Sequence, residues 1–578
     1  VVVVEKEHLL GGNSNKASSG INACCPHNNT YGDVLNDFYQ DTLKSAGTSA
    51  RPDLIQVLVD NSAGAVTWLK ERVGVDLSLL AQLGGHSHKR THRPSNGMAG
   101  AEIIYGMQKA VRAYEKVGKA RILIDSRVTQ LLVEEDGTVV GVEYQSTLEG
   151  DAVREEVRAH NVVLATGGFA SDRRQGSYLA QYRPELLSMP ATAGPFSTGD
   201  GIALATPLGA GTVDMDKVQI HPTGWIDPTD PSNPSKILAA ELMRGVGGIL
   251  INSDGQRFCN ELGTRAYVSN QMLSHDAHFA ETGVWDRSSP VVDFALVLSS
   301  SAAADGKKHV DLYSHKGLLT RLEGITALAA WMNLPVETVR ATLQQYQQDA
   351  KNGVDGFGKK SFRGVPQDDL ETEVFFAGRV TPVLHYCMGG ITIDTEGNVL
   401  NERTQQPIPG LHAAGEVTGG VHGANRLGGN SLLECTVFGT IVGKKLPVHT
   451  ATHSNQLLQQ SAQESSNQKK KQEKNVTRAE LEQHNNDGDC WVAIHGVVYD
   501  LTEFAEEHPA GAESIRVLAG LDGSDAFQAV HNAGILDDFE DERIGVLVGD
   551  GDGDDDDDDT TTTNASNATE EDCEDPTQ

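Results

Sequence analysis

The sequence predicts an α/β protein followed by a smaller α+β unit, and three observations lead to this expectation. A chain of 578 residues is too long for one hydrophobic core, so two or three domains are expected. Hydrophobic residues make up 38% of the chain and 61 residues are glycine, as in glycine-rich α/β proteins. Apolar patterning stops from residue 447 to 474 and returns up to residue 548, which indicates a linker between two folded units.

Composition restricts the class of partner. The formal net charge of −33 disfavours nucleic acid and anionic membranes, although an acidic tail carries much of this charge. No run approaches the roughly 20 apolar residues that span a bilayer, so no membrane association is expected. The 7 cysteines form no metal-ligand pattern and their number is odd, which favours free thiols in a reducing compartment. Both a cytoplasmic and a mitochondrial location agree with that.

The chain opens in an apolar strand, residues 1–4, that ends at Glu5. In a dinucleotide-binding fold, an acid at the end of the second strand binds a ribose hydroxyl and follows a GxGxxG turn by about 20 residues. Here the acid is present and the turn is absent. We therefore expect that a segment upstream is missing, together with any targeting peptide.

Glycine-rich segments follow in a specific order. Residues 11–14 and 18–22 are mostly small, so their backbone can approach a pyrophosphate closely. Residues 161–168 and 411–416 each form an apolar strand that runs into a glycine turn. One such turn is weak evidence, because glycine turns close many strands. Together, and in this order, the four segments form a pattern that is much more specific than any one of them.

Five further blocks complete the pattern, and chance rarely produces five blocks in one order. They are His221-Pro222-Thr223-Gly224, Ala239 to Gly245, Arg257 to Arg265, His385-Tyr386-Cys387-Met388-Gly389-Gly390, and Gly415 to Asn430. From residue 1 to about 446, the sequence resembles the flavoprotein family that contains fumarate reductases and succinate dehydrogenase flavoprotein subunits. It looks most like the soluble, single-chain fumarate reductases of microbes and fungi, because nothing resembles the His-Ser motif that carries covalent FAD in membrane-bound relatives.

This resemblance implies a Rossmann-like FAD-binding domain with an inserted α+β capping domain. Residues 1–215 would form the first, N-terminally truncated part of the FAD-binding domain, residues 216–386 the capping or substrate domain, and residues 387–446 the second FAD-binding part. The FAD is expected to be held without a covalent bond, and weakly in the chain as given, because the glycine turn is absent. The residues that the resemblance implies for FAD are Glu5, Ser14, Gly20, Asn22, Thr166, Gly167, Gly168, Asp200, Glu416, Ser431 and Leu432.

A small dicarboxylate must be gripped at both ends while its double bond lies against the flavin, and cations and imidazoles do that. By resemblance, Arg426 and His385 bind one carboxylate, and His221 binds the other. Ala240 replaces a hydroxyl residue found in some bacterial relatives. This replacement removes one hydrogen bond, which is worth on the order of 1 kcal/mol.

The resemblance assigns Arg265 as the acid that protonates the alkene carbon opposite the hydride. Arginine normally keeps its charge, so the loss of a proton requires rapid resupply. Glu241 and Arg244 lie three positions apart, on one face if the segment is helical. The resemblance makes them a proton relay from solvent to Arg265.

The second folded unit, residues 474–549, looks like a cytochrome b5 domain. Its signals are residues 489–502, the segment His508-Pro509-Ala510-Gly511, and residues 526–531. That family ligates the iron of haem b through two histidines, here His508 and His531. Two imidazole ligands leave no open position, so the haem would carry electrons. Ala510 replaces the first glycine of the usual HPGG turn.

Three more residues, Phe504, Leu518 and Phe527, would line the haem pocket by the same resemblance. Residues 447–473 are predicted to be an exposed linker. Residues 550–578 carry an aspartate run with almost nothing apolar, which is typical of a disordered tail.

The combined expectation is an FAD-dependent fumarate reductase in which an external donor reduces the haem and the haem reduces FAD. Because no second dinucleotide fingerprint occurs, a separate electron-donating reductase is the expected partner, and the acidic surface suits a basic one. We expect a monomer. One alternative is an enzyme that acts on another activated alkene, such as urocanate, an acrylate or a ketosteroid. The other is a chain without FAD whose b5 domain serves as an electron carrier.

Overall fold

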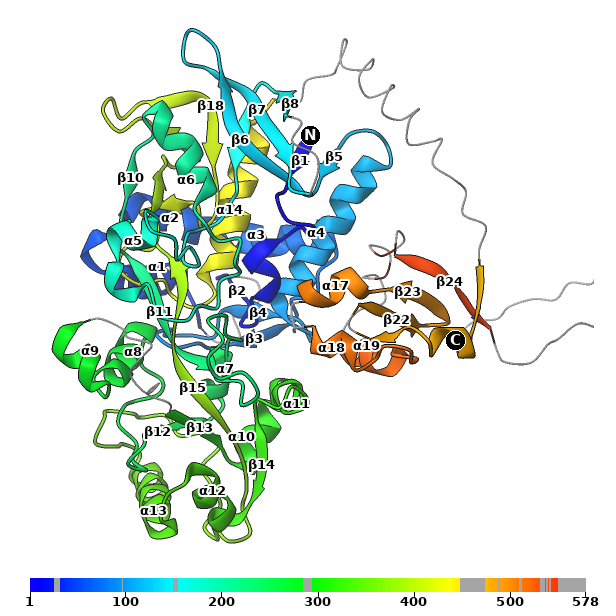
Figure 1. Cartoon of the computed structure of the whole chain (residues 1–578). Coiled ribbons are helices and arrows are strands. Elements are labelled where there is room, and N and C mark those ends of the chain that lie inside the picture. The colour runs from blue at the N-terminus through cyan, green and yellow to red at the C-terminus, as the bar shows by residue number, and fades with distance from the viewer. Residues whose placement is uncertain are drawn as a thin grey trace, which may run out of the picture.

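The computed structural model describes residues 1–24, 32–95, 97–148, 154–283, 294–447, 474–486, 488–508, 512–530, 536, 539 and 542–548. Three parts are visible in Figure 1: an upper body from both ends of the first 447 residues, a lower body from the residues between, and a smaller unit from residue 474 onward. The α/β class and the added α+β unit are confirmed. The domain boundaries at residues 215, 386 and 446 stay predictions.

The upper body contains the parallel strands expected of a nucleotide-binding fold. Strand β1 (Val2–Val4) pairs with β5 (Arg121–Leu123), and β9 (Val162–Leu164) pairs with β18 (Pro407–Ala413), both in parallel. Strand β17 (Asn398–Leu400) lies antiparallel to β18. Helix α14 (Asn430–Lys445) shares a core cluster with residues from the beginning of the chain, so segments more than 400 residues apart form one core.

The parallel sheet is divided into two pieces. Among the described residues, β1 pairs only with β5, and β9 ends the separate sheet β17-β18-β9. The side of β9 away from β18 therefore pairs with no described strand, and Val163 in β9 is 40% exposed. The strand directions agree with the expected Rossmann-like arrangement, but no described strand joins the two halves.

Further elements complete the upper body. The helices are α1 (Leu35–Ala46), α2 (Pro52–Asp60), α3 (Ser62–Trp68), α4 (Ala99–Glu115), α5 (Tyr178–Tyr182), α6 (Asp200–Ala205) and the short helix η1 (Gly12–Lys16). The strands are β2 (Ile21–Asn22), β3 (Leu79–Ala81), β4 (Thr91–Arg93), β6 (Ser126–Val133), β7 (Val139–Ser146), β8 (Arg154–Arg158), β10 (Thr212–Val213), β16 (Gly390–Thr392) and β19 (Thr418–Gly419).

The lower body is built on an antiparallel sheet whose two faces are both covered. Its strands are β11 (Val218–Trp225), β15 (Val374–Cys387), β13 (Phe294–Leu298), β12 (Ile249–Ile251) and β14 (Thr320–Glu323). One face packs against α8 (Arg265–Leu273), α10 (Ser300–Asp305) and α11 (Lys307–His315), and the other against α12 (Gly324–Met332) and α13 (Val336–Asn352). Helix α9 spans Ala277–Thr282. Because both faces are buried, β13 is apolar at every position.

The smaller unit, orange to red in Figure 1, contains a five-stranded sheet in the order β20-β24-β23-β22-β21. Its strands are β20 (Lys474–Thr477), β21 (Asn485–Asn486), β22 (Asp489–Ile494), β23 (Val497–Asp500) and β24 (Arg543–Val548). Its helices are α16 (Arg478–Leu481), α17 (Thr502–Glu507), α18 (Glu513–Arg516) and α19 (Ser524–Val530). The predicted linker, apart from residue 447, and the predicted tail lie outside the described residues.

Two findings in the described part of the chain concern the membrane and the cysteines. No helix there is long and apolar enough to cross a bilayer. In the same part of the chain, Cys24, Cys259, Cys387, Cys435 and Cys490 form no disulfide.

Candidate functional site

A bulge between strands β11 and β15 brings two predicted histidines together. Gln219 pairs with Tyr386 and Ile220 pairs with Leu384, so His385 is the extra residue between two registered pairs. A bulge of this kind re-aims a side chain that regular pairing would point elsewhere. The ring centroids of His221 and His385 lie 5.1 Å apart.

Both imidazoles are neutral. Burial, and then the nearby guanidinium of Arg265, lower the pKa of His221 and of His385 well below the usual value. The Nδ1 atom of His221 accepts the backbone N–H of Thr223 at 3.2 Å, so the ring proton resides on Nε2. This Nε2 is buried and has no partner among the described residues. His221 therefore presents an unused hydrogen-bond donor.

Arg265 is the first residue of helix α8 and is 5% exposed. Its Nε donates to Glu241 Oε2 at 3.0 Å, and its Nη1 donates to Gln219 Oε1 at 2.8 Å. The guanidinium is thus held on two sides. Two fixed contacts set both the position and the orientation of its plane.

Glu241 begins helix α7 (Glu241–Gly245), and its Oε1 accepts the backbone N–H of Gly84 at 2.8 Å. Burial by itself raises the pKa of Glu241, but the charges of Arg265 and Arg244 oppose this and lower it to about 2. The carboxylate is therefore ionised at neutral pH while both guanidinium groups are charged.

Arg244 lies on the same helix as Glu241, which is the condition under which their spacing puts them on one face, but it does not share a hydrogen bond with it. Its Nη1 donates to the Glu261 carbonyl at 2.6 Å, and its Nε and Nη2 have no partner among the described residues. The predicted relay is therefore joined by hydrogen bonds from Glu241 to Arg265, whereas Arg244 acts on Glu241 through its charge.

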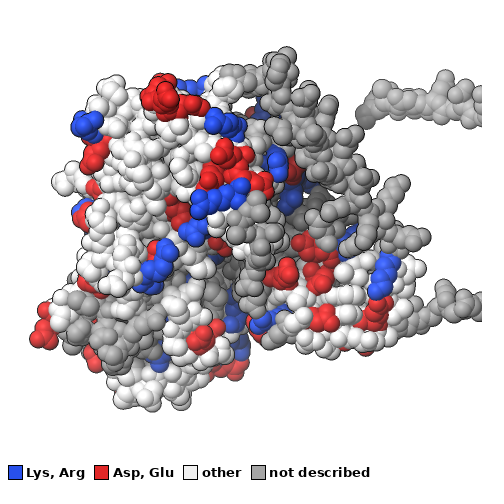
Figure 2. Space-filling model, turned by 45° about the horizontal axis from the view of Figure 1, so that its top comes forward, with Lys and Arg blue, Asp and Glu red and all other residues white. Residues whose placement is uncertain are grey.

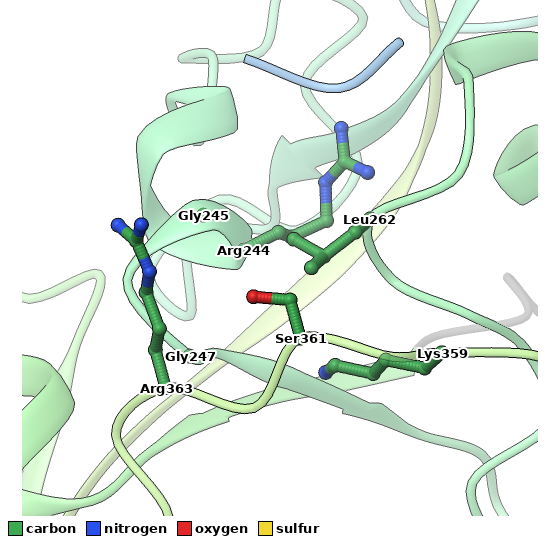
Figure 3. Close-up of a pocket in the computed structure, with 7 residues that line it drawn as sticks. All are labelled: Arg244, Gly245, Gly247, Leu262, Lys359, Ser361 and Arg363. Atoms are coloured by element: carbon green, nitrogen blue, oxygen red, sulfur yellow. The ribbon is translucent and has the colours of Figure 1, made fainter. Parts of the chain in front are cut away.

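A narrow gap lies beside this helix, lined by Arg244, Gly245, Gly247, Leu262, Lys359, Ser361 and Arg363. Figure 3 shows that the guanidinium of Arg244 extends away from Ser361. The gap therefore lies on the side of Arg244 opposite its guanidinium. It includes none of the predicted substrate ligands.

Arg426 stacks on the ring of Tyr386, with 4.3 Å from the guanidinium carbon to the ring centroid. It is 4% exposed, and its Nε has no partner among the described residues. Burial lowers the pKa of Arg426 to about 10, so the group stays a cation at neutral pH. A cation–π interaction with the face of the Tyr386 ring stabilises this charge.

Sequence reasoning missed Gln219, which connects the two arginines. Its Oε1 accepts from Arg265, and its Nε2 donates to the Arg426 carbonyl at 2.9 Å and to Asn425 Oδ1 at 3.0 Å. One signal in the sequence could have identified Gln219. It lies two residues before His221, and side chains two positions apart on a strand point to the same side.

Tyr386 belongs to one of the sequence motifs but has no predicted role there, and Glu434 lies outside those motifs. The Tyr386 hydroxyl donates to Glu434 Oε2 at 2.6 Å, and His422 Nε2 pairs with the same oxygen at 2.9 Å. Thr418 donates to the other oxygen at 3.1 Å. Burial by itself raises the pKa of Glu434, but these contacts, with His422 first, hold it below the usual value. The network fixes the ring that carries Arg426.

We expect Glu434→Gln to lower the free energy of unfolding by about 3 kcal/mol at pH 7, because it leaves the buried partners of one charge uncompensated. A lowered carboxyl pKa stabilises the fold above the unfolded pKa of about 4.3, and this contribution is lost as pH falls through the folded value. The difference between variant and wild type should therefore shrink at acidic pH.

Urea unfolding at pH 7 and at pH 3.5 measures both effects. Glu396→Gln is the matched control, because Glu396 is an exposed carboxylate paired with Lys445. Glu396→Gln should leave the free energy of unfolding close to that of wild type at both pH values. A difference for Glu434→Gln that is the same at both pH values would contradict the assignment.

The residues predicted for FAD fit a cofactor with a pyrophosphate. Glu5 follows β1, Thr166 to Gly168 follow β9, and Glu416 follows β18, so they lie at the carboxyl ends of parallel strands, where nucleotides bind in such folds. Gly167 has φ +71° and open space where a Cβ would be. Burial raises the pKa of Glu416 to about 7, and one of its oxygens accepts the Cys387 N–H at 2.8 Å.

Other members of the predicted FAD set are engaged by the protein itself. Asp200 pairs with Lys6 at 2.8 Å, and Asn22 donates to Gly428 O and to Asn430 Oδ1, both at 2.7 Å. Gly20 has φ +119°, and a Cβ there would lie 2.4 Å from the His92 carbonyl. These residues shape the loops around the site. Ser14 lies in η1, and Ser431 and Leu432 begin α14.

The haem pocket is described in part. His508 directly follows α17, and its ring meets Phe504 edge-on at 5.6 Å. Phe504, Leu518 and Phe527 all pack against the core of this unit, as a pocket lining requires. His531 and the turn Pro509 to Gly511 lie outside the described residues. The donor set that can be seen, one imidazole among aromatic and aliphatic side chains, fits a haem.

Comparisons with known proteins extend this picture. Residues 1–432 match the family model described as FAD binding domain, and residues 477–548 match the one described as cytochrome b5-like heme/steroid binding domain. A fumarate reductase of Schizosaccharomyces pombe is 41% identical, covering 77% of this chain and 84% of that protein. Fumarate reductase 1 of Saccharomyces cerevisiae is 38% identical, covering 77% and 93%.

A solved structure agrees with these relatives. The open conformation of a flavocytochrome c3 fumarate reductase superposes with a TM-score of 0.60 at 33% identity, covering 77% of this chain and 73% of that one. The upper and lower bodies therefore share their fold with an enzyme of known structure.

Proposed function

Because the chain belongs to the FAD-dependent fumarate reductase family, we propose that it reduces fumarate to succinate at the site formed by His221, His385, Arg265 and Arg426. The observation that carries this proposal is a pair of buried donors, His221 Nε2 and Arg426 Nε, that have no partner in the part of the chain that the structure describes. Buried donors without partners are costly, so their presence favours a ligand that supplies acceptors. A dicarboxylate supplies them at both ends.

Binding divides between neutral and charged groups. The neutral His221 donates through Nε2 to one carboxylate, while Arg426 and His385 hold the other. A neutral imidazole binds an anion by a hydrogen bond alone, so the two carboxylates experience different fields. Arg426 adds a positive charge to the hydrogen bonds at the other carboxylate.

The bound FAD supplies the hydride, and Arg265 supplies the proton to the other alkene carbon. Fumarate thus gains two electrons and two protons in all. Loss of a proton from Arg265 removes the charge that keeps the pKa of Glu241 low. The carboxylate then becomes a better base and takes up a proton, which it passes to Arg265. Arg244 keeps this pKa low enough for the proton to leave again.

We propose that residues 1–215 and 387–446 hold FAD, that residues 216–386 supply most of the substrate ligands, and that residues 474–549 hold haem b through His508 and His531. Electrons would reach the flavin from this haem. The donor that we infer is a separate reductase with a basic surface, because the chain is strongly acidic.

A substrate panel with reduced viologen as donor and FAD in excess tests the proposal. Fumarate should exceed acrylate and urocanate in kcat/KM by a factor on the order of 10⁴, because an acid with one carboxylate leaves part of the clamp unpaired. A preference for a mono-acid would overturn it. An absorbance spectrum without a flavin band near 450 nm would favour the electron-carrier alternative.

We expect Arg426→Lys to raise the KM for fumarate and to lower kcat, because both ground state and transition state use this grip. An ammonium cannot replace the planar guanidinium that stacks on Tyr386 and offers two donors to a carboxylate. Steady-state kinetics should show a loss in kcat/KM of about 10² or more.

Arg379→Lys is the matched control, because Arg379 also stacks on a ring, that of Trp331 at 4.8 Å, but lies outside the site. It should leave the kinetics unchanged. An unchanged KM in Arg426→Lys would show that Arg426 does not bind the substrate.

A further inference from the structure

The haem-binding unit contacts the rest of the chain on one face of helix α4. Tyr105 of α4 packs against the apolar core of that unit, which includes Leu501 and Ile515. Lys316, directly after α11, donates from Nζ to Ser514 Oγ in α18 at 3.2 Å. Figure 1 shows α17 and α18 beside α4. The contact thus has an apolar centre and a polar margin.

The same helix supports the loop that is expected to hold the FAD pyrophosphate. Gly100 donates to the Ala17 carbonyl at 2.7 Å, and Gln108 donates to the Leu10 carbonyl at 2.8 Å. A Cβ at Gly100 would lie 2.0 Å from Ser14 O, so the helix and the loop meet without space between them. Tyr105 lies between these two contacts, which are separated by about 12 Å of helix. One helix therefore touches both the haem unit and the flavin loop.

Charge favours the same arrangement. Residues 474–548 carry 16 acidic and 4 basic side chains. Lys109, Arg112, Lys308 and Lys316 lie on or next to α4 and α11. Figure 2 shows acidic side chains over the surface of the smaller unit and basic side chains along its border with the larger body. Opposite charges steer two surfaces together and fix their orientation.

We propose that the face formed by α4 and the end of α11, centred on Tyr105 and Lys316, is the docking surface for the haem unit of this chain. This inference rests on the proposed function, because docking there brings the haem unit against the helix that supports the flavin loop. With both cofactors bound, the docked unit would supply electrons to the flavin site one at a time, so each fumarate that is reduced would require two such transfers.

Small-angle X-ray scattering of the full chain, with both cofactors bound, tests the docking without an activity measurement. Tyr105→Ala and Lys316→Glu should each increase the radius of gyration, and Lys316→Arg should restore the compact value. High salt should have the same effect as Lys316→Glu, since it screens the charges. Tyr114→Ala, an exposed tyrosine of the same helix, and Lys351→Glu, an exposed lysine of α13, are the controls.

Rapid mixing of the fully reduced chain with fumarate tests the consequence. Reoxidation of the haem should slow about tenfold or more in Tyr105→Ala and Lys316→Glu, while fumarate reduction from viologen stays within twofold of wild type. Scattering curves and haem reoxidation rates equal to those of the controls would overturn the docking surface. If the wild-type chain failed to reduce fumarate with viologen as donor, the proposed function would be wrong. That outcome is distinct from failure of the docking surface, in which viologen-driven activity persists.

Discussion

Arg265→Lys is expected to lower the turnover number of fumarate reduction by ~10²–10⁴, the loss associated with removing a general acid. Lysine keeps the charge but cannot reach Glu241 and Gln219 at once, as the guanidinium does at 3.0 and 2.8 Å. The acid then lies in the wrong place and loses its direct link to the carboxylate. Binding should suffer less, since His221, His385 and Arg426 remain.

The comparison that decides the role is kcat against KM. Arg265→Lys should affect mainly kcat, whereas Arg426→Lys should change both constants. Flavin absorbance serves as a check that each variant is folded and loaded. If the turnover number of Arg265→Lys stayed within a few-fold of wild type, the acid must be another group, and Glu241 or His385 would take the role.

His508→Ala is expected to abolish bis-histidine haem binding, while fumarate reduction with an artificial donor survives. The imidazole is one of two axial ligands by resemblance, and it contacts Phe504 in the pocket wall. Loss of one strong ligand leaves an open iron position and an altered Soret band. Activity with a donor that must pass electrons through the haem should disappear.

His495→Ala is the matched control, because this exposed histidine belongs to the same unit and lies 5.9 Å from the Phe527 ring, centroid to centroid. It should keep the haem spectrum. His531→Ala should behave as His508→Ala does. If viologen-driven activity collapsed in either ligand variant, the haem and flavin parts would not be independent in catalysis.

The sequence by itself determined the kind of protein. Glycine turns after apolar strands, charged and imidazole residues in motifs, and the segment around His508 are local patterns, and each requires only neighbouring residues to be recognised. The parallel strands and the two-unit organisation follow from the same local information, because strand periodicity and turn chemistry act over short distances. The spacing of Glu241 and Arg244 is local information of the same kind, because it places them on one face if their segment is helical.

Tertiary structure alone decided how these parts meet. The bulge that turns His385 toward His221 depends on the register of two strands more than 150 residues apart, which no local pattern encodes. Gln219, Tyr386 and Glu434 gain their roles only through partners distant in the sequence, and Arg244 proved to act on Glu241 through charge without a shared hydrogen bond. The contact of Tyr105 with the haem unit likewise depends on packing between two folded bodies. The physical reason is that burial, register and long-range pairing set these contacts, whereas the motifs specify only which chemical groups are available.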